Sequence, residues 1–178
     1  MDWKKLTNDV VAAASAAFAS LRSEKPNEHF YVFSLYTDSD AWTILPSANS
    51  IEKYEAILRK TRETNEKQIA YSKWATAEWA YEAWGKKLFT GIYRELEDHR
   101  KSLPQSEKDD EAYKHSVHEC MISALKQMDE DGVFAKGRET IVLYVSSSDG
   151  DEAFDLENQS VKRLNPKEIY LPFLKRYG

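Results

Sequence analysis

The stretch His29-Phe30-Tyr31-Val32-Phe33-Ser34-Leu35-Tyr36 decides the fold class of this chain. Its apolar side chains fall on both alternating faces, which is typical of a strand that is covered on both sides. A polar turn over 37–40 and a second strand over 41–45 predict a β-hairpin that Pro46 ends. The apolar run within 140–146 predicts a third buried strand.

Helical spacing of apolar residues fills most of the chain around these strands. Asn49 and Glu52 resemble a capping box, and Ile51, Tyr54 and Leu58 would be the buried face of the helix that follows. The segment 71–84 fits neither a helical nor a strand period, and we expect a short edge strand followed by a turn. The predicted helices cover 2–22, 49–64, 86–103, 106–132, 151–164 and the stretch from Pro166, with Ser106 and Asn165 as capping residues and Pro104 and Gly132 as stops.

The order of these elements indicates the architecture. Strands and helices do not alternate as they would in a doubly wound sheet. We therefore predict an α+β fold in which a small, mainly antiparallel sheet of three to four strands is covered by several helices. The length of 178 residues fits a single globular domain over 1–178.

Composition excludes several classes of protein. One cysteine rules out a disulfide framework and zinc sites built on cysteine pairs. No stretch approaches the roughly 18 apolar residues of a membrane helix, so we expect a cytoplasmic protein with no membrane contact. Glycine-rich phosphate-binding motifs are absent, and no cofactor is expected.

Acidic residues are concentrated between residues 97 and 157. This stretch has 16 acidic and 7 basic residues, a net of -9, whereas the flanks together carry +4. Such a surface repels phosphate backbones, so direct nucleic-acid binding is not expected, and it favours encounter with a basic partner. The alternative is that these acids only solvate helix starts and loops.

A possible metal site lies on the helix predicted for 106–132. The candidate residues are Glu111, His115, His118 and Glu119. Side chains at i, i+4 and i+7 share one helix face, and imidazole with carboxylate is a usable ligand set. This face lies away from the apolar stripe through Val117 and Met121, so it is expected to meet solvent or a partner together with Ile122. Cys120 is placed at the edge of the apolar stripe, as a small buried residue.

An aromatic cluster is the other candidate. Its rings either roof the sheet or anchor a protein interface, where Trp and Tyr are favoured. The cluster comprises Tyr71, Trp74, Trp79, Tyr81 and Trp84.

Three segments together resemble a known family. They are 30–45 with its Tyr-Val-Phe-Ser-Leu-Tyr strand, 74–81 with Glu-Trp-Ala-Tyr, and 134–145, followed by Arg-Leu-Asn-Pro at 163–166. They are similar, in the same order, to a bacterial family catalogued as domain of unknown function 4303. The resemblance implies no catalytic residues. It implies that this chain is similar to small proteins that are often encoded beside secreted polymorphic toxins. In such gene pairs, the protein encoded next to the toxin acts as its immunity protein.

We therefore expect a binding protein rather than an enzyme, one that neutralises a cognate, basic toxin domain through an acidic surface. A metal-assisted hydrolase using the His/Glu face and a self-associating scaffold are the alternatives, and the oligomeric state stays open. The expected partner-binding residues are Asp109, Asp110, Glu111, His115, His118, Ile122, Asp129, Glu130, Asp131, Asp149, Asp151, Glu152, Trp79 and Trp84.

Overall fold

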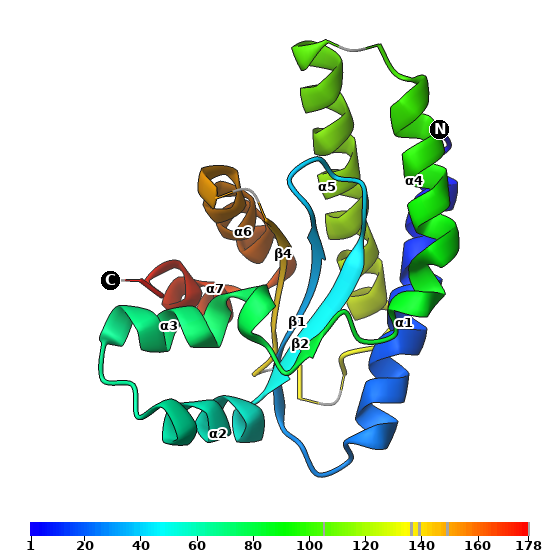
Figure 1. Ribbon diagram of the computed structural model, residues 1–178. Helices are drawn as coiled ribbons and strands as arrows, with labels where there is room; N and C mark the ends of the chain where they lie inside the picture. Colours follow the sequence, from blue (N-terminus) through cyan, green and yellow to red (C-terminus); the bar gives the residue numbers. More distant parts are fainter. Residues whose placement is uncertain (105, 136, 139, 149, 178) are drawn as a thin grey trace.

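A mixed sheet with the strand order β3-β2-β1-β4 forms the centre of the molecule (Figure 1). Its strands are β1 (Phe30–Thr37), β2 (Leu45–Ser50), β3 (Tyr81–Glu82) and β4 (Val142–Ser147). β2 pairs antiparallel with β1 and β3, whereas β4 pairs parallel with β1. The computed structural model describes residues 1–104, 106–135, 137–138, 140–148 and 150–177, with the backbone alone for 150–152.

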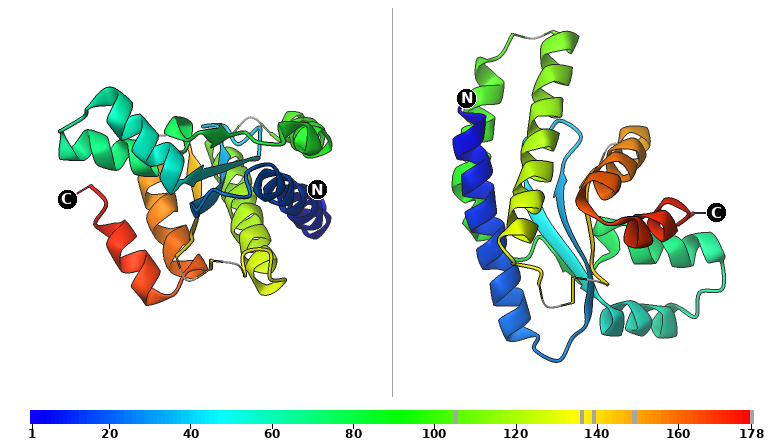
Figure 2. Two further views of the ribbon diagram at one scale, coloured as in Figure 1. Left: turned by 90° about the horizontal axis from the view of Figure 1, so that it is seen from below. Right: turned by 180° about the vertical axis from the view of Figure 1, so that it is seen from behind.

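Helices cover both faces of this sheet, which confirms the predicted α+β class (Figure 2). On one face lie α1 (Trp3–Glu24), α4 (Thr90–Ser102) and α5 (Glu107–Glu130). On the other side lie α2 (Ile51–Thr61), α3 (Glu66–Trp74), α6 (Gly150–Leu164) and α7 (Lys167–Leu174). Short 3-10 turns, η1 (Thr76–Glu78) and η2 (Lys86–Phe89), flank β3.

Each face of the sheet has its own apolar cluster, because β1 and β4 are apolar on both sides. Phe33 and Leu35 pack with α1 and α5 on one face. Tyr31 and Tyr144 pack with rings from α3 and α7 on the other. In the described part of the chain, no helix combines the length and apolar character needed to cross a bilayer.

The second strand lies later in the chain than predicted. It covers Leu45–Ser50 rather than 41–45, and Pro46 lies inside it opposite Leu35. β3 pairs only with Ser47 and Ala48, so Pro46 lies beyond the reach of β3 and its missing N–H breaks no ladder bond there.

The segment 71–84 was only partly predicted. The expected edge strand exists as β3, but Tyr71–Trp74 is the end of helix α3.

α2 begins after Ser50, whose hydroxyl accepts the N–H of Lys53, and the predicted Asn49 cap is wrong. The predicted buried face of α2 forms only in part: Tyr54 is half-buried against Tyr31, whereas Ile51 is exposed and no residue of the helix is fully buried.

Helix α5 begins and ends as predicted. The hydroxyl of Ser106 accepts the N–H of Asp109, and Gly132 follows the helix with a φ of +77°. α7 differs from its prediction: Pro166 is its N-cap residue, while the Asn165 side chain instead bonds the N–H and C=O of Leu143 on β4.

Candidate functional site

One cavity lies beyond the carboxyl ends of the parallel strands β1 and β4. It has a volume of about 420 Å³, and we call it the strand-end pocket. Ligands of open sheets commonly bind at this edge, because side chains from successive strand ends converge there. Its lining includes Tyr36, Tyr71, Thr76, Glu82, Ser146, Phe154, Glu157 and Tyr177.

A buried charge pair supports the wall formed by α6. Glu157 is 7% exposed, and its Oε1 accepts from Ser146 Oγ at 2.6 Å. Its Oε2 accepts from Nη2 of Arg176 at 2.8 Å, a guanidinium that is itself fully buried. Burial raises the pKa of Glu157, although Ser146 and Arg176 favour the carboxylate. Both carboxylate oxygens are thus engaged, which suits a structural role better than proton transfer.

Exposed rings border the pocket. Tyr71 and Phe154 are 44% and 43% exposed, so both rings are accessible from the pocket. Tyr36 donates its hydroxyl to Glu82 at 3.0 Å. Burial, and then the carboxylate of Glu82, raise the pKa of Tyr36, so this phenol stays a hydroxyl donor at neutral pH.

The charge of the pocket has one sign. Its two ionisable carboxylates are Glu82 and Glu157, and the described lining residues include no Lys, Arg or His. The charge of Glu157 is compensated by Arg176, which leaves Glu82 as the uncompensated carboxylate. The pocket can therefore accept a cation or a neutral group between rings, and it disfavours phosphate.

The acids predicted for partner binding at the start of α5 are partly used within the fold. Asp109 bonds Ser106 at the helix cap, and Asp110 pairs with Arg100 and with Lys114. Glu111 and the neighbouring His115 are exposed. Only part of this predicted cluster is thus free for a partner.

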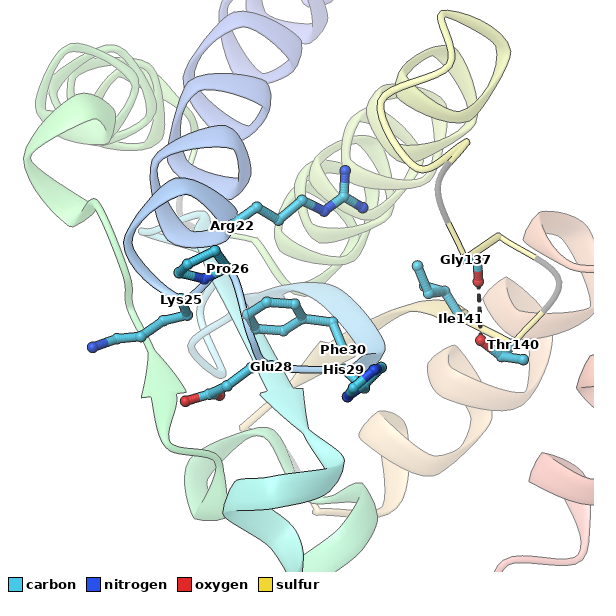
Figure 3. Close-up of a pocket in the computed structure, with 9 residues that line it drawn as sticks. All are labelled: Arg22, Lys25, Pro26, Glu28, His29, Phe30, Gly137, Thr140 and Ile141. Carbon is cyan, nitrogen blue, oxygen red and sulfur yellow. Dashed lines mark hydrogen bonds between the residues drawn. The ribbon is translucent and has the colours of Figure 1, made fainter.

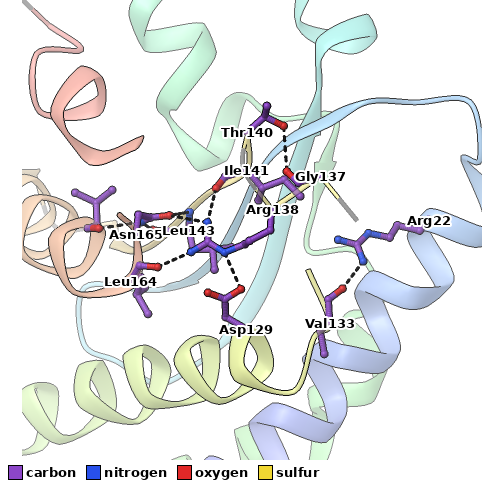
Figure 4. A network of polar contacts seen from close by, with 11 residues as sticks. Arg22, Asp129, Val133, Gly137, Arg138, Thr140, Ile141, Leu143, Leu164 and Asn165 are labelled. Atoms are coloured by element: carbon purple, nitrogen blue, oxygen red, sulfur yellow. Dashed lines mark hydrogen bonds and ion pairs between the residues drawn. The ribbon is translucent and has the colours of Figure 1, made fainter. Parts of the chain in front are cut away.

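The acids at the other end of α5 form a second, separate group. Twenty residues of helix separate the two groups, about 30 Å at 1.5 Å per residue. Asp129 accepts from Nε of Arg138 at 2.6 Å, and Arg138 also bonds the carbonyl oxygens of Ile141 and Leu164 (Figure 4). Glu130 and Asp131 are exposed. The predicted single acidic surface is therefore divided.

The remaining predicted acids are sequence neighbours of residues that line the strand-end pocket. Asp149 and the side chains of Asp151 and Glu152 lie outside the described residues. Ser148 and Ala153, on either side of this run, both line the pocket. In the sequence, the acidic run 149–152 stands between these two lining residues.

The predicted metal face is not assembled among the described residues, where no group of three or more potential His, Cys, Asp or Glu ligands gathers. His118 is half-buried, and burial, reinforced by His115 and Lys114, lowers its pKa to about 4. Glu119 is held by both terminal nitrogens of Arg163 from α6. Cys120 is buried as predicted, and burial raises its pKa.

Two predicted contact residues are inside the fold, which corrects the sequence interpretation. Ile122 is 3% exposed, because α5 packs against α6 and the sheet as well as α1. Trp79 is 4% exposed, and its indole N–H donates to the carbonyl oxygen of Lys73. Trp84 is half-buried on the other face of the sheet, where its N–H donates to Ser20.

Sequence reasoning missed most of the pocket. Ser146 reaches the pocket through a parallel pairing of two strands more than 100 residues apart, which leaves no local pattern. Phe154 and Tyr177 line the pocket from α6 and the end of the chain, and Arg176 contacts Glu157 behind it. One signal was present: Phe154 and Glu157 are three residues apart and share a face of the predicted helix 151–164.

Comparison with known proteins assigns the family but no activity. Neither the curated proteins nor the solved structures include a match to this chain. A family model described as "Domain of unknown function (DUF4303)" matches residues 10–166, most of the chain. The chain therefore belongs to the DUF4303 family.

Proposed function

We propose that this protein is an immunity-type binding protein that neutralises a cognate bacterial toxin domain acting in the cytoplasm. The observation that carries the proposal is the strand-end pocket, where exposed rings surround carboxylates and no basic side chain is among the described lining residues. Aromatic residues are favoured as interface anchors, and a carboxylate beside rings suits a Lys or Arg side chain of a basic partner.

The distribution of charge supports this choice of surface. Glu82 is exposed at the pocket, and the acidic run 149–152 is bracketed by residues that line it. Acids of one sign around a contact surface speed association with a basic domain and disfavour nucleic acid. The proposed contact surface therefore moves from the start of α5, where Asp109 and Asp110 serve the fold, to this edge of the sheet.

A non-catalytic role agrees with the bonding of Glu157. Its two oxygens are occupied by Ser146 and Arg176, so the proposed role of this residue is to hold α6 and the C-terminal segment in place. The rings of Tyr71 and Phe154, supported in this way, would present a preformed surface.

Calorimetric titration with the purified product of the adjacent toxin gene tests the proposal. We expect a stoichiometric complex that Glu82→Lys weakens by about tenfold or more and that added salt weakens further. Glu130→Lys is the matched control, since it reverses an exposed carboxylate at the distant end of α5, and it should leave the affinity within about twofold. Absence of a complex, or equal weakening by the two variants, would contradict the proposal.

A further inference from the structure

Arg22, near the end of α1, is a half-buried cation without a carboxylate partner among the described residues. Its Nη1 donates to the carbonyl oxygen of Val133, and its guanidinium lies over the rings of Phe33 at 5.0 Å and Phe134 at 5.9 Å. Its Nη2 is buried and has no hydrogen-bond partner in the described structure. Rings and one carbonyl solvate this guanidinium, but they do not neutralise it.

Arg22 differs in this respect from comparable arginines. Arg100 pairs with Asp110, Arg138 pairs with Asp129, and Arg176 pairs with Glu157. Each of these guanidiniums is buried or half-buried, and each has its charge compensated. Buried charges are normally paired, because the free energy lost when a charge leaves water is far larger than the stabilisation that rings or a single carbonyl provide. Burial lowers the pKa of Arg22, the direction expected for such a site.

The unpaired guanidinium lies at a cavity of about 280 Å³ (Figure 3). Phe30 lies on one side of this cavity, and Ile141 and Gly137 lie on the opposite side, so its walls are largely apolar. Lys25 extends away from the side where Ile141 lies. We call this cavity the Arg22 pocket.

The acidic and imidazole side chains among the lining residues of the Arg22 pocket are already engaged. Glu28 accepts hydrogen bonds from Ser50 and Tyr81, each at 2.6 Å. The ring of His29 bonds Glu52 at 2.6 Å. Among the described lining residues, Arg22 and Lys25 thus lack a counter-ion, and Lys25 extends away from the side where Ile141 lies.

We propose that the Arg22 pocket binds a small organic carboxylate whose compact apolar body packs between Phe30 and Ile141 and whose carboxylate pairs with the guanidinium of Arg22. Among the described lining residues, the uncompensated guanidinium of Arg22 suits a monoanion, while Glu28 and Glu52 nearby disfavour a dianion such as phosphate. The planar guanidinium matches the geometry of a carboxylate, and a mostly apolar cavity with one converging charge is the usual composition of a small-molecule site. This site is independent of the proposed toxin-binding surface.

A titration of the wild-type protein with benzoate, followed by amide and guanidinium NMR signals, tests the proposal. Benzamide is the control probe, because it has the same ring and no charge. We expect benzoate, and not benzamide, to shift the Nε–H signal of Arg22 and the amide signals of Phe30 and Ile141. Equal shifts from both probes, or shifts confined to other surfaces, would overturn the proposal.

Variants locate the charge that binds. Arg22→Gln should weaken benzoate binding by about tenfold or more, whereas Lys60→Gln, which changes an exposed lysine on α2 outside the lining of the cavity, should leave it within about twofold. Should Arg22→Gln fail to fold, Arg22→Lys retains the charge without the planar fork and is expected to bind benzoate more weakly than the wild type. Unchanged affinity in a folded Arg22 variant would show that Arg22 does not hold the anion.

Discussion

Replacement of Arg176 by Met should destabilise the protein by about 3 kcal/mol at neutral pH. The side chains of Arg176 and Glu157 are 0% and 9% exposed, and removal of one member of such a pair typically costs about 3–5 kcal/mol. We expect the lower end of this range for two reasons. Met retains part of the packing on Phe173, and Glu157 can take up a proton when its partner is gone.

The sign of the pH dependence follows from this protonation. In Arg176→Met, burial should hold the pKa of Glu157 above its unfolded value even more strongly than in the wild type. A carboxyl with a raised folded-state pKa binds more protons when folded, so the stability of the variant is lost as pH rises through that pKa. The loss relative to wild type should therefore be smaller at pH 5 than at pH 8.

Urea unfolding followed by tryptophan fluorescence measures both effects. Arg59→Met is the control, because the Arg59–Glu55 pair is 70% and 56% exposed and should change stability by less than about 0.5 kcal/mol. The double variant Glu157→Gln with Arg176→Met should be more stable than Arg176→Met alone, since no unpaired charge remains. A loss below about 1 kcal/mol at pH 8, or the same loss at both pH values, would refute the reasoning.

Three further predictions concern stability, and urea unfolding measures each of them. His118 has a folded pKa of about 4, below its ordinary value of 6.5, so wild-type stability should fall by up to about 3 kcal/mol as pH drops from 6.5 through 4. His118→Gln should remove this component, and an identical pH profile would show that His118 does not cause it. Arg62, exposed at the end of α2 with a φ of +51°, should be replaceable by Gly with a gain of about 0.5–1 kcal/mol; a loss of stability would contradict the strain argument. Ser106→Ala removes the cap of α5 and should cost about 1 kcal/mol, while Ser106→Asp should preserve stability; equal losses would exclude the capping role.

The central strand and the longest helices could be predicted because their patterns are local. Residues 29–36 are apolar on both faces, and the structure places helices on both sides of β1. Ser106 and Gly132 mark the ends of α5 by their own chemistry, a hydroxyl acceptor and a left-handed backbone. These residues carry the information about their structure within a few positions.

The misplaced segments depend on partners that are distant in the sequence. Pro46 can lie within β2 because β3 is only two residues long. Helix α3 has little amphipathic pattern of its own, and the ring of Trp74 packs against Tyr31 and Phe173 from elsewhere in the chain. Ile122 is buried because α6 lies along the face of α5 that a helical wheel assigns to solvent.

For the candidate site, the sequence indicates only the types of side chain to expect and not which residues come together. Acidic charge and aromatic rings were identified as the contact chemistry, but the residues that combine them in one cavity come from β1, α3, β3, β4, α6 and the end of the chain. Asp110 and Asp129 look like free surface acids in the sequence, and their ion pairs with Arg100 and Arg138 depend on the tertiary fold.

The parallel pairing of β1 with β4 has a consequence during synthesis on the ribosome. More than 100 residues separate the end of β1 at Thr37 from the start of β4 at Val142, and β4 is the neighbour that closes one edge of β1. At about 5–20 residues per second, that edge stays unpaired for roughly 5–20 s after β1 leaves the exit tunnel. The nascent chain, with a long apolar strand waiting for its neighbour, is thus the state of this protein most exposed to aggregation and to capture by chaperones.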